Sequence, residues 1–214
     1  MPSRYQLLIF DLDGTLVDSS GDLAAATNHA MRELGFPPQP VENIREFIGD
    51  GARKLVERSL PPGKEALMDK AVEIFLRYYD QHVLDRTRPY DGIQETLDAL
   101  VGIPKAIATN KPERFTKRII EGLRWEGYFP QVIGGDTLPQ RKPDALVVRT
   151  ICDRVGISPV GTLVIGDGPQ DVGAAKAAGA ASCGVSWGFR GPERLREAGA
   201  DYIIERPQDL VQLL

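Results

Sequence analysis

Short apolar runs, each bounded by polar or glycine-rich turns, recur along this 214-residue chain and constrain its fold more than any other feature. They are rich in β-branched residues and occupy residues 6–10, 106–108, 131–133, 162–165 and 202–204. Strands buried on both faces lose the alternation of apolar and polar residues and look like this. Helical periodicity fills residues 93–100, 113–123, 143–155 and 171–178. Strands that alternate with helices predict an α/β fold with a doubly wound parallel sheet.

One long segment interrupts this alternation between the first two strands. Residues 17–86 contain helical periodicity and no strand pattern, with apolar residues at three- and four-residue intervals from Leu23 to Ala30. We therefore predict an all-helical insert in the α/β domain. The expected division is a core of residues 1–16 and 87–214 and a small helical domain of residues 17–86.

Composition narrows the class of partner. The net charge of −4 argues against nucleic acid, and no apolar run is long enough to cross a membrane. Cys152 and Cys183 are isolated in mostly apolar surroundings, so buried thiols are favoured over a disulfide or a metal role. Residues 1–4 show no signal-peptide pattern, and we expect a cytoplasmic protein, either a monomer or a homodimer.

Polar residues follow three of the predicted strands at the point where each ends. Ligands of open α/β sheets bind outside the carboxyl ends of the strands, so these residues are expected to converge at one edge. They are Asp11-Leu12-Asp13-Gly14-Thr15, Thr109-Asn110-Lys111 and Gly166-Asp167-Gly168-Pro169-Gln170-Asp171, with Lys142-Pro143 opening a helix between the last two. An acidic turn alone is usually solvated, but the ordered series favours a site.

Carboxylate oxygens without nearby histidine or cysteine ligands select Mg²⁺. Asp11, Asp167 and the backbone carbonyl of Asp13 are the expected metal ligands. Asp171 is expected to act through water or by supporting a ligand, since an acidic residue in the first turn of a helix is also favoured by the dipole. A bound metal offsets the repulsion among these carboxylates.

A phosphoryl group is the simplest anion for the remaining donors. The Lys142 ammonium and the Thr109 hydroxyl are expected to bind it. Backbone N–H groups of Leu12, Asp13 and Asn110 would complete the anion site. Lys142 alone would be an ordinary lysine at the start of a helix, and only its place in the series marks it.

The roles of the first two acidic residues follow from their chemistry. Asp11 is ionised at neutral pH and needs no base to attack phosphorus, which would form an acyl phosphate and expel an alcohol. Asp13 is then expected to protonate the leaving oxygen and later to deprotonate the hydrolytic water. Gly14 permits the sharp turn between them and the following chain.

With Asp11 to Thr15, Thr109-Asn110, Lys142, and Gly166-Asp167 with Asp171 in this order, the chain resembles the haloacid dehalogenase-like hydrolase superfamily. This resemblance implies a Rossmann-like core, a mobile cap, Mg²⁺ and catalysis by Asp11 and Asp13. The position of the insert is similar to that in the small-cap subclass. An aspartate at position 13 favours a phosphatase over a dehalogenase, which has no leaving alcohol to protonate.

Within the superfamily the chain is most similar to phosphoglycolate phosphatases, notably over residues 47–60 of the insert. Gly49-Asp50-Gly51 with Lys54 is expected to hold a small carboxylate of the substrate; a plain interhelical turn is the alternative. Two departures are Ala145, where the group often has proline, and Gly168, where a hydroxyl residue is common. Trp187 and Phe189 either line the site or pack in the interior, and packing is favoured.

The predicted function is Mg²⁺-dependent hydrolysis of a small phosphorylated metabolite, with 2-phosphoglycolate as the preferred substrate. The alternatives are another phosphatase of the superfamily or a sugar phosphomutase similar to β-phosphoglucomutase, which would return the phosphoryl group to its substrate. A non-enzymatic phospho-acceptor module is a more remote alternative. Such a module needs a long-lived acyl phosphate, whereas Asp13 is placed to activate water.

Overall fold

The structure is a computed structural model that describes residues 4–214, so the first three residues of the N-terminal pattern lie outside the described part. Six parallel strands form one sheet in the order β5-β4-β1-β6-β7-β8. The strands are β1 (Leu7–Phe10), β4 (Lys105–Ala108), β5 (Gln131–Ile133), β6 (Thr162–Gly166), β7 (Ala181–Val185) and β8 (Tyr202–Ile204). The chain order reverses on either side of β1, as in a doubly wound sheet.

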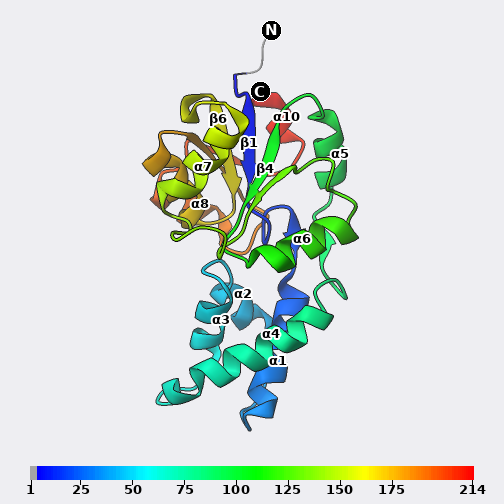
Figure 1. Cartoon of the computed structure of the whole chain (residues 1–214), viewed down its shortest axis with the longest axis vertical. Helices are drawn as coiled ribbons and strands as arrows, with labels where there is room; N and C mark the ends of the chain where they lie inside the picture. Colours follow the sequence, from blue (N-terminus) through cyan, green and yellow to red (C-terminus); the bar gives the residue numbers. More distant parts are fainter. Residues whose placement is uncertain (1–3) are drawn as a thin grey trace.

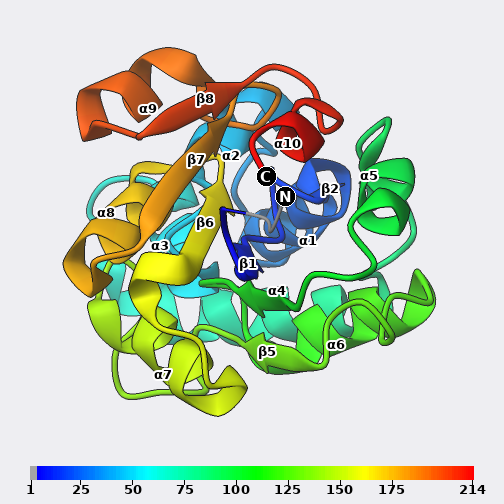
Figure 2. The same cartoon turned by 90° about the horizontal axis from the view of Figure 1, so that it is seen from above.

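Helices cover both faces of the sheet (Figure 2). One face is covered by α7 (Ala145–Val155) and α8 (Pro169–Ala178), which share a hydrophobic cluster with Leu7 and Ile9 of β1. The other is covered by α5 (Ile93–Ala99), α6 (Glu113–Gly122) and α10 (Asp209–Gln212), which share a cluster with Leu8 and Phe10. A short 3-10 turn, Pro159–Gly161, precedes β6, and α9 (Gly191–Ala198) packs beside α8 and β7. The predicted fold class is confirmed.

The register of the central strands brings three strand ends to the same level. Phe10 of β1 pairs with Ile107 of β4 and with Ile165 of β6. The residues that follow these strands therefore leave the sheet side by side, as the carboxyl ends of parallel strands must. This register places the polar turns after β1, β4 and β6 around one point.

The helices of the insert lie at this end of the sheet, opposite the chain termini (Figure 1). They are α1 (Ser20–Glu33), α2 (Val41–Phe47), α3 (Ala52–Ser59), the 3-10 turn Glu65–Leu67 and α4 (Met68–Gln81). A two-stranded antiparallel ribbon of β2 (Val17–Asp18) and β3 (Arg88–Pro89) connects them to the sheet. Among the described residues, no helix combines the length and apolar character required to span a membrane.

Some local details differ from the sequence-based expectations. The helix predicted from residue 143 begins at Ala145, because the Asp144 side chain caps it by accepting a hydrogen bond from the Leu146 N–H at 2.8 Å. α8 begins at Pro169, two residues before the predicted start. Both helices end, as predicted, at glycines in the left-handed conformation, Gly156 and Gly179. Cys152 and Cys183 are free and buried, as favoured from the sequence.

Candidate active site

Three buried carboxylates gather where β1 and β6 end. Oxygens of Asp11, Asp167 and Asp171 all lie within 4.8 Å of one another. The Lys142 Nζ atom is 3.0 Å from Asp11 and 2.6 Å from Asp171. One ammonium group cannot balance three carboxylates, so the cluster carries excess negative charge when all three are ionised. A divalent cation would remove that excess.

The electrostatics of the cluster show the same imbalance. Burial, followed by the charges of Asp11 and Asp171, raises the pKa of Asp167 to about 8. Burial also raises the pKa of Asp171 to about 6, although Lys142 acts in the opposite direction. Burial acts to lower the pKa of Lys142, but Asp11 and Asp171 outweigh it and raise the value. The ammonium of Lys142 is therefore a permanent charge beside Asp11.

A loop after β7 holds Asp167 in place. The Phe189 backbone N–H donates to Asp167 Oδ2 at 2.7 Å, and Trp187 Nε1 donates to the Thr15 carbonyl at 3.1 Å. A Cβ atom on Gly14 or Gly188 would collide with Asp167, so both positions require glycine. The loop thus supports Asp167 through the Phe189 backbone N–H and is itself held to the turn after β1 by the Trp187 side chain.

The turn after β1 orients the first carboxylate. The Leu12 N–H, predicted to face a phosphoryl group, donates to Asp11 Oδ1 at 2.7 Å. Gly14 has a φ of +84°, a conformation that other residues rarely adopt. Because the turn is fixed in this way, Asp11 and Asp13 both reach the cavity described next.

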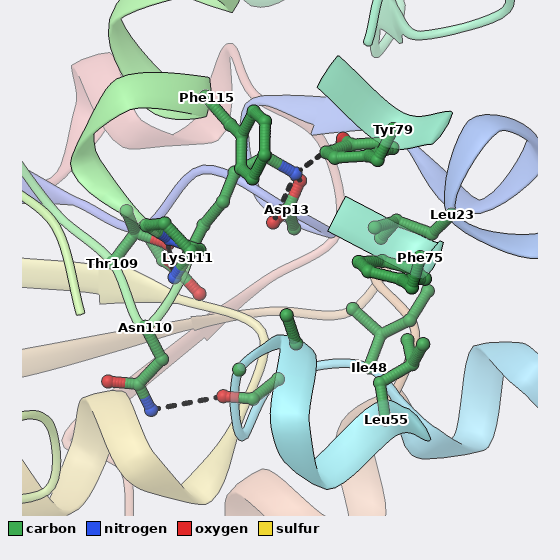
Figure 3. Close-up of a pocket in the computed structure, with 15 residues that line it drawn as sticks. Asp13, Leu23, Ile48, Leu55, Phe75, Tyr79, Thr109, Asn110, Lys111 and Phe115 are labelled. Carbon is green, nitrogen blue, oxygen red and sulfur yellow. Dashed lines mark hydrogen bonds and ion pairs between the residues drawn. The ribbon is translucent and has the colours of Figure 1, made fainter. Parts of the chain in front are cut away.

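A cavity separates the sheet from the insert (Figure 3). The insert contributes mostly apolar side chains, while the sheet side contributes polar ones. Those from the insert include Leu23, Ile48, Leu55, Phe75 and Tyr79, and those from the sheet side include Asp11, Asp13, Thr109, Asn110 and Lys111. Ligand cavities commonly combine an apolar wall with a few convergent polar groups.

The two residues after β4 differ in their contacts. Thr109 is buried on the cavity wall, and its hydroxyl accepts a hydrogen bond from the Lys111 N–H at 3.3 Å. The Asn110 amide bridges the two parts of the molecule, donating to the Gly49 carbonyl at 3.0 Å and to the Lys142 carbonyl at 3.2 Å. Its side chain is therefore engaged with backbone carbonyls, and its backbone N–H remains the group predicted to bind phosphate.

The predicted substrate turn of the insert only partly faces the cavity. Gly49 and Gly51 line it. Lys54 instead pairs with Glu57 at 2.7 Å on a half-exposed surface and is absent from the cavity wall.

Asp50 contacts neighbouring polar side chains rather than the cavity. It pairs with Arg58 at 2.6 Å and accepts a hydrogen bond from Gln170 at 2.5 Å. Burial would raise the pKa of Asp50, but these hydrogen bonds and the charges of Arg58 and Arg190 lower it. Asp50 thus joins the insert to the sheet domain.

Three side chains around Asp13 were given no role from the sequence. Ser19 Oγ donates to Asp13 Oδ1 at 2.5 Å, and Lys111 Nζ lies 3.1 Å from both carboxylate oxygens. Lys111 also donates to the Tyr79 hydroxyl at 2.6 Å. Lys111 belongs to the polar turn after β4 that was expected at this edge of the sheet, whereas Ser19 and Tyr79 lie in the predicted insert and carry no sequence signal.

Comparison with known proteins agrees with this arrangement. The family described as haloacid dehalogenase-like hydrolase matches residues 8–185, from β1 to β7. The chain belongs to this family. The resemblance to the haloacid dehalogenase-like superfamily that was found in the sequence is therefore confirmed.

Individual relatives match over nearly the whole chain. A phosphoglycolate phosphatase from Pseudomonas putida is 41% identical, with 86% of this chain and 70% of the relative covered. A phosphoglycolate phosphatase from Chromobacterium violaceum is 37% identical, and the match covers 99% of this chain and 97% of the relative. A solved structure described as a predicted phosphoglycolate phosphatase from Haemophilus somnus superposes with a TM-score of 0.93 at 29% identity. The superposition covers 100% of this chain and 99% of that structure's chain. The expected similarity to phosphoglycolate phosphatases is confirmed.

Proposed function

We propose that this chain is a phosphoric monoester hydrolase that acts on a small phosphorylated metabolite, with 2-phosphoglycolate as its preferred substrate. The observation that carries the proposal is Asp11, a buried carboxylate beside Lys142, with Asp13 two residues along facing the same cavity. The names of the relatives supply the substrate.

The acidic cluster fits Mg²⁺. Its donors are carboxylate oxygens of Asp11, Asp167 and Asp171. The negative charges of Asp11 and Asp171, which add to burial in raising the pKa of Asp167, support a bound cation. Asp11, Asp167 and the Asp13 carbonyl would hold the ion, with Asp171 supporting them. When bound, Mg²⁺ would screen the repulsion between Asp11 and the phosphoryl oxygens.

In this mechanism the chain's own groups perform each transfer. An Asp11 oxygen attacks phosphorus, and the bond to the alcohol oxygen breaks as Asp13 gives that oxygen a proton. Asp13, now ionised, takes a proton from water, which attacks phosphorus and releases inorganic phosphate and the Asp11 carboxylate. Lys142, the Thr109 hydroxyl and the backbone N–H of Asn110 would hold the phosphoryl oxygens, and the Leu12 N–H, which donates to Asp11 in this structure, would join them once Asp11 turns toward phosphorus.

The cavity shields the leaving alcohol with apolar side chains. The insert closes over it with the apolar side chains of Ile48, Leu55 and Phe75, so the alcohol is shielded from water. We further propose a cytoplasmic location, in keeping with two free and buried cysteines. Whether the chain works as a monomer or a homodimer stays a prediction.

Replacing the nucleophile tests the mechanism. We expect Asp11→Asn to lower Mg²⁺-dependent hydrolysis of 2-phosphoglycolate by at least about a thousandfold, because an amide cannot form the acyl phosphate. Asp69→Asn, a change of an exposed residue in α4, serves as the control. Release of inorganic phosphate is measured across a set of phosphate esters and ranked by kcat/KM.

Two results would contradict the proposal. Asp11→Asn with most of its activity would exclude the acyl phosphate. Transfer of phosphate within a sugar phosphate, without release of inorganic phosphate, would identify a phosphomutase instead.

A further inference from the structure

The Lys111 ammonium lies between the sheet domain and the insert (Figure 3). It is 3.1 Å from each Asp13 carboxylate oxygen and donates to the Tyr79 hydroxyl at 2.6 Å. Lys111 follows β4, whereas Tyr79 belongs to α4 of the insert. A single ammonium group thus connects Asp13 to a side chain on the other side of the cavity.

The donors of Lys111 are fully used by these partners. An ammonium group has three N–H bonds, and two carboxylate oxygens and one hydroxyl oxygen accept from it here. The side chain is only 4% exposed. Lys111 is therefore committed to Asp13 and has no spare donor for a second anionic group of a substrate.

Tyr79 is closely packed by aromatic side chains. Its ring stacks on that of Phe75, with the ring centroids 5.6 Å apart, and makes an edge-to-face contact with Phe115, with the centroids 5.0 Å apart. Tyr79 is 1% exposed. Burial raises the pKa of Tyr79 to about 12, so the phenol keeps its proton and its oxygen accepts from Lys111.

Two parts of the chain contact the Asp13 carboxylate directly, through Ser19 and Lys111, and a third, Tyr79, acts on it through Lys111. Ser19, which follows the connecting strand β2, donates to the same oxygen that Lys111 contacts. Without Tyr79, Lys111 would keep its charge but lose the contact that fixes its direction. The position of the Asp13 carboxyl group therefore depends on where α4 lies relative to the sheet.

We propose that Tyr79 and Lys111 are positioning residues that place Asp13 for proton transfer to the leaving alcohol only when the insert is seated on the sheet domain. This inference rests on the proposed function, in which Asp13 is the acid. It couples closure of the insert to the acid step through one hydrogen bond from Lys111 to Tyr79.

Three substrates separate this role from direct recognition of substrate. p-Nitrophenyl phosphate releases an anion stable enough to leave without a proton, whereas ethyl phosphate and 2-phosphoglycolate release alcohols that need one. Only 2-phosphoglycolate carries a carboxylate. The value of kcat/KM is compared for each, because it reports the step in which the alcohol departs and not the later hydrolysis.

Tyr79→Phe removes only the hydroxyl group. We expect it to lower kcat/KM about tenfold for both alkyl phosphates and less than about threefold for p-nitrophenyl phosphate. Lys111→Met should show the same pattern with a larger loss. Tyr78→Phe is the matched control, because the neighbouring Tyr78 stacks on His29 and His82 and does not line the cavity.

The outcomes are distinct. An equal loss on all three substrates, or a loss confined to 2-phosphoglycolate, would overturn the inference. Asp13→Asn tests the proposed function separately: if it lacks the preference for the activated substrate, Asp13 is not the acid. If Asp13→Asn shows that preference and Tyr79→Phe does not, only the positioning role fails. Should Lys111→Met not fold, Tyr79→Phe still decides.

Discussion

At the residue scale, Asp167 is buried beside two other carboxylates, so ionising it lowers the stability of the metal-free fold. In the unfolded chain its pKa has the ordinary value near 3.8, whereas in the metal-free fold it is raised to about 8. A raised pKa contributes stability that is complete below about pH 4 and is lost as pH rises through about 8.

We expect the Tm of the metal-free protein to fall between pH 6 and pH 8.5, because the folded state retains a proton that the unfolded state has released. Mg²⁺ should raise Tm more at pH 8 than at pH 6, since proton and metal compete for the same carboxylate. Scanning calorimetry of the wild type and of Asp167→Asn measures both effects. A substitution that leaves the slope with pH unchanged would show that Asp167 is not its source.

At the residue scale, the sequence predicted the groups that follow strands but not those that reach them from elsewhere. Asp11 and Asp167 were found because the ends of parallel strands must meet, and Lys142 was found from its place in the ordered series of motifs. Ser19 and Tyr79 lie in the predicted insert, and no pattern indicates that their side chains turn toward Asp13. Lys54 was assigned to the substrate from its place in a turn, yet it pairs with Glu57 outside the cavity.

At the scale of elements, Asp22 links the start of α1 to residues 86 and 87, which precede β3, through hydrogen bonds. These are the two chain segments that join the insert to the sheet. Asp22 is 1% exposed and accepts hydrogen bonds from the Arg86 N–H, the Thr87 N–H and the Thr87 hydroxyl. Its carboxylate thus replaces the backbone partners that a longer ribbon would provide. The start of α1 and the segment before β3 are held together by this one side chain.

We expect Asp22→Ala to lower the free energy of unfolding by about 2–4 kcal/mol, because the substitution leaves the N–H groups that Asp22 accepts from without an acceptor. Asp69→Ala removes a carboxylate whose side chain is 89% exposed and should change the value by less than about 0.5 kcal/mol. Urea denaturation measures both. Equal stabilities for the two variants would contradict this role for Asp22.

The predicted strands and helices are mostly present, and the missed elements have physical reasons. β7 consists of Ala181-Ser182-Cys183-Gly184-Val185, whose small residues suit a close approach by Leu195 but carry little strand propensity. β2 and β3 are two residues each and depend on their mutual pairing. The boundaries predicted for the two domains, 17–86 against the rest, stay a prediction.

At the scale of the whole molecule, the turn before α3 is where the insert meets the sheet domain. Arg190 donates to the Ile48 carbonyl and lies 3.8 Å from Asp50. Gln170 and Asn110 add hydrogen bonds to Asp50 and to the Gly49 carbonyl. These contacts are largely shielded from solvent, so they hold the insert against the sheet domain more strongly than exposed ion pairs do.

Arg190→Ala should therefore shift the molecule toward open arrangements. A ligand that binds only the closed form has an apparent affinity reduced by the closed fraction, so we expect KM to rise about tenfold while kcat at saturating substrate and Mg²⁺ changes little. Arg194→Ala is the matched control, because its exposed pair with Glu46 also joins the insert to the sheet domain, at 3.3 Å.

Steady-state kinetics with 2-phosphoglycolate measures the effect of both substitutions. An unchanged KM in Arg190→Ala would mean that these contacts do not limit closure, and a fall in kcat alone would place Arg190 in the chemical step. If Arg194→Ala raised KM as much as Arg190→Ala, the shielded cluster would have no special role. The expected difference follows from desolvation and from the number of contacts. Arg190 is shielded from water and also donates to the Ile48 carbonyl, whereas the Arg194–Glu46 pair at the same junction is exposed.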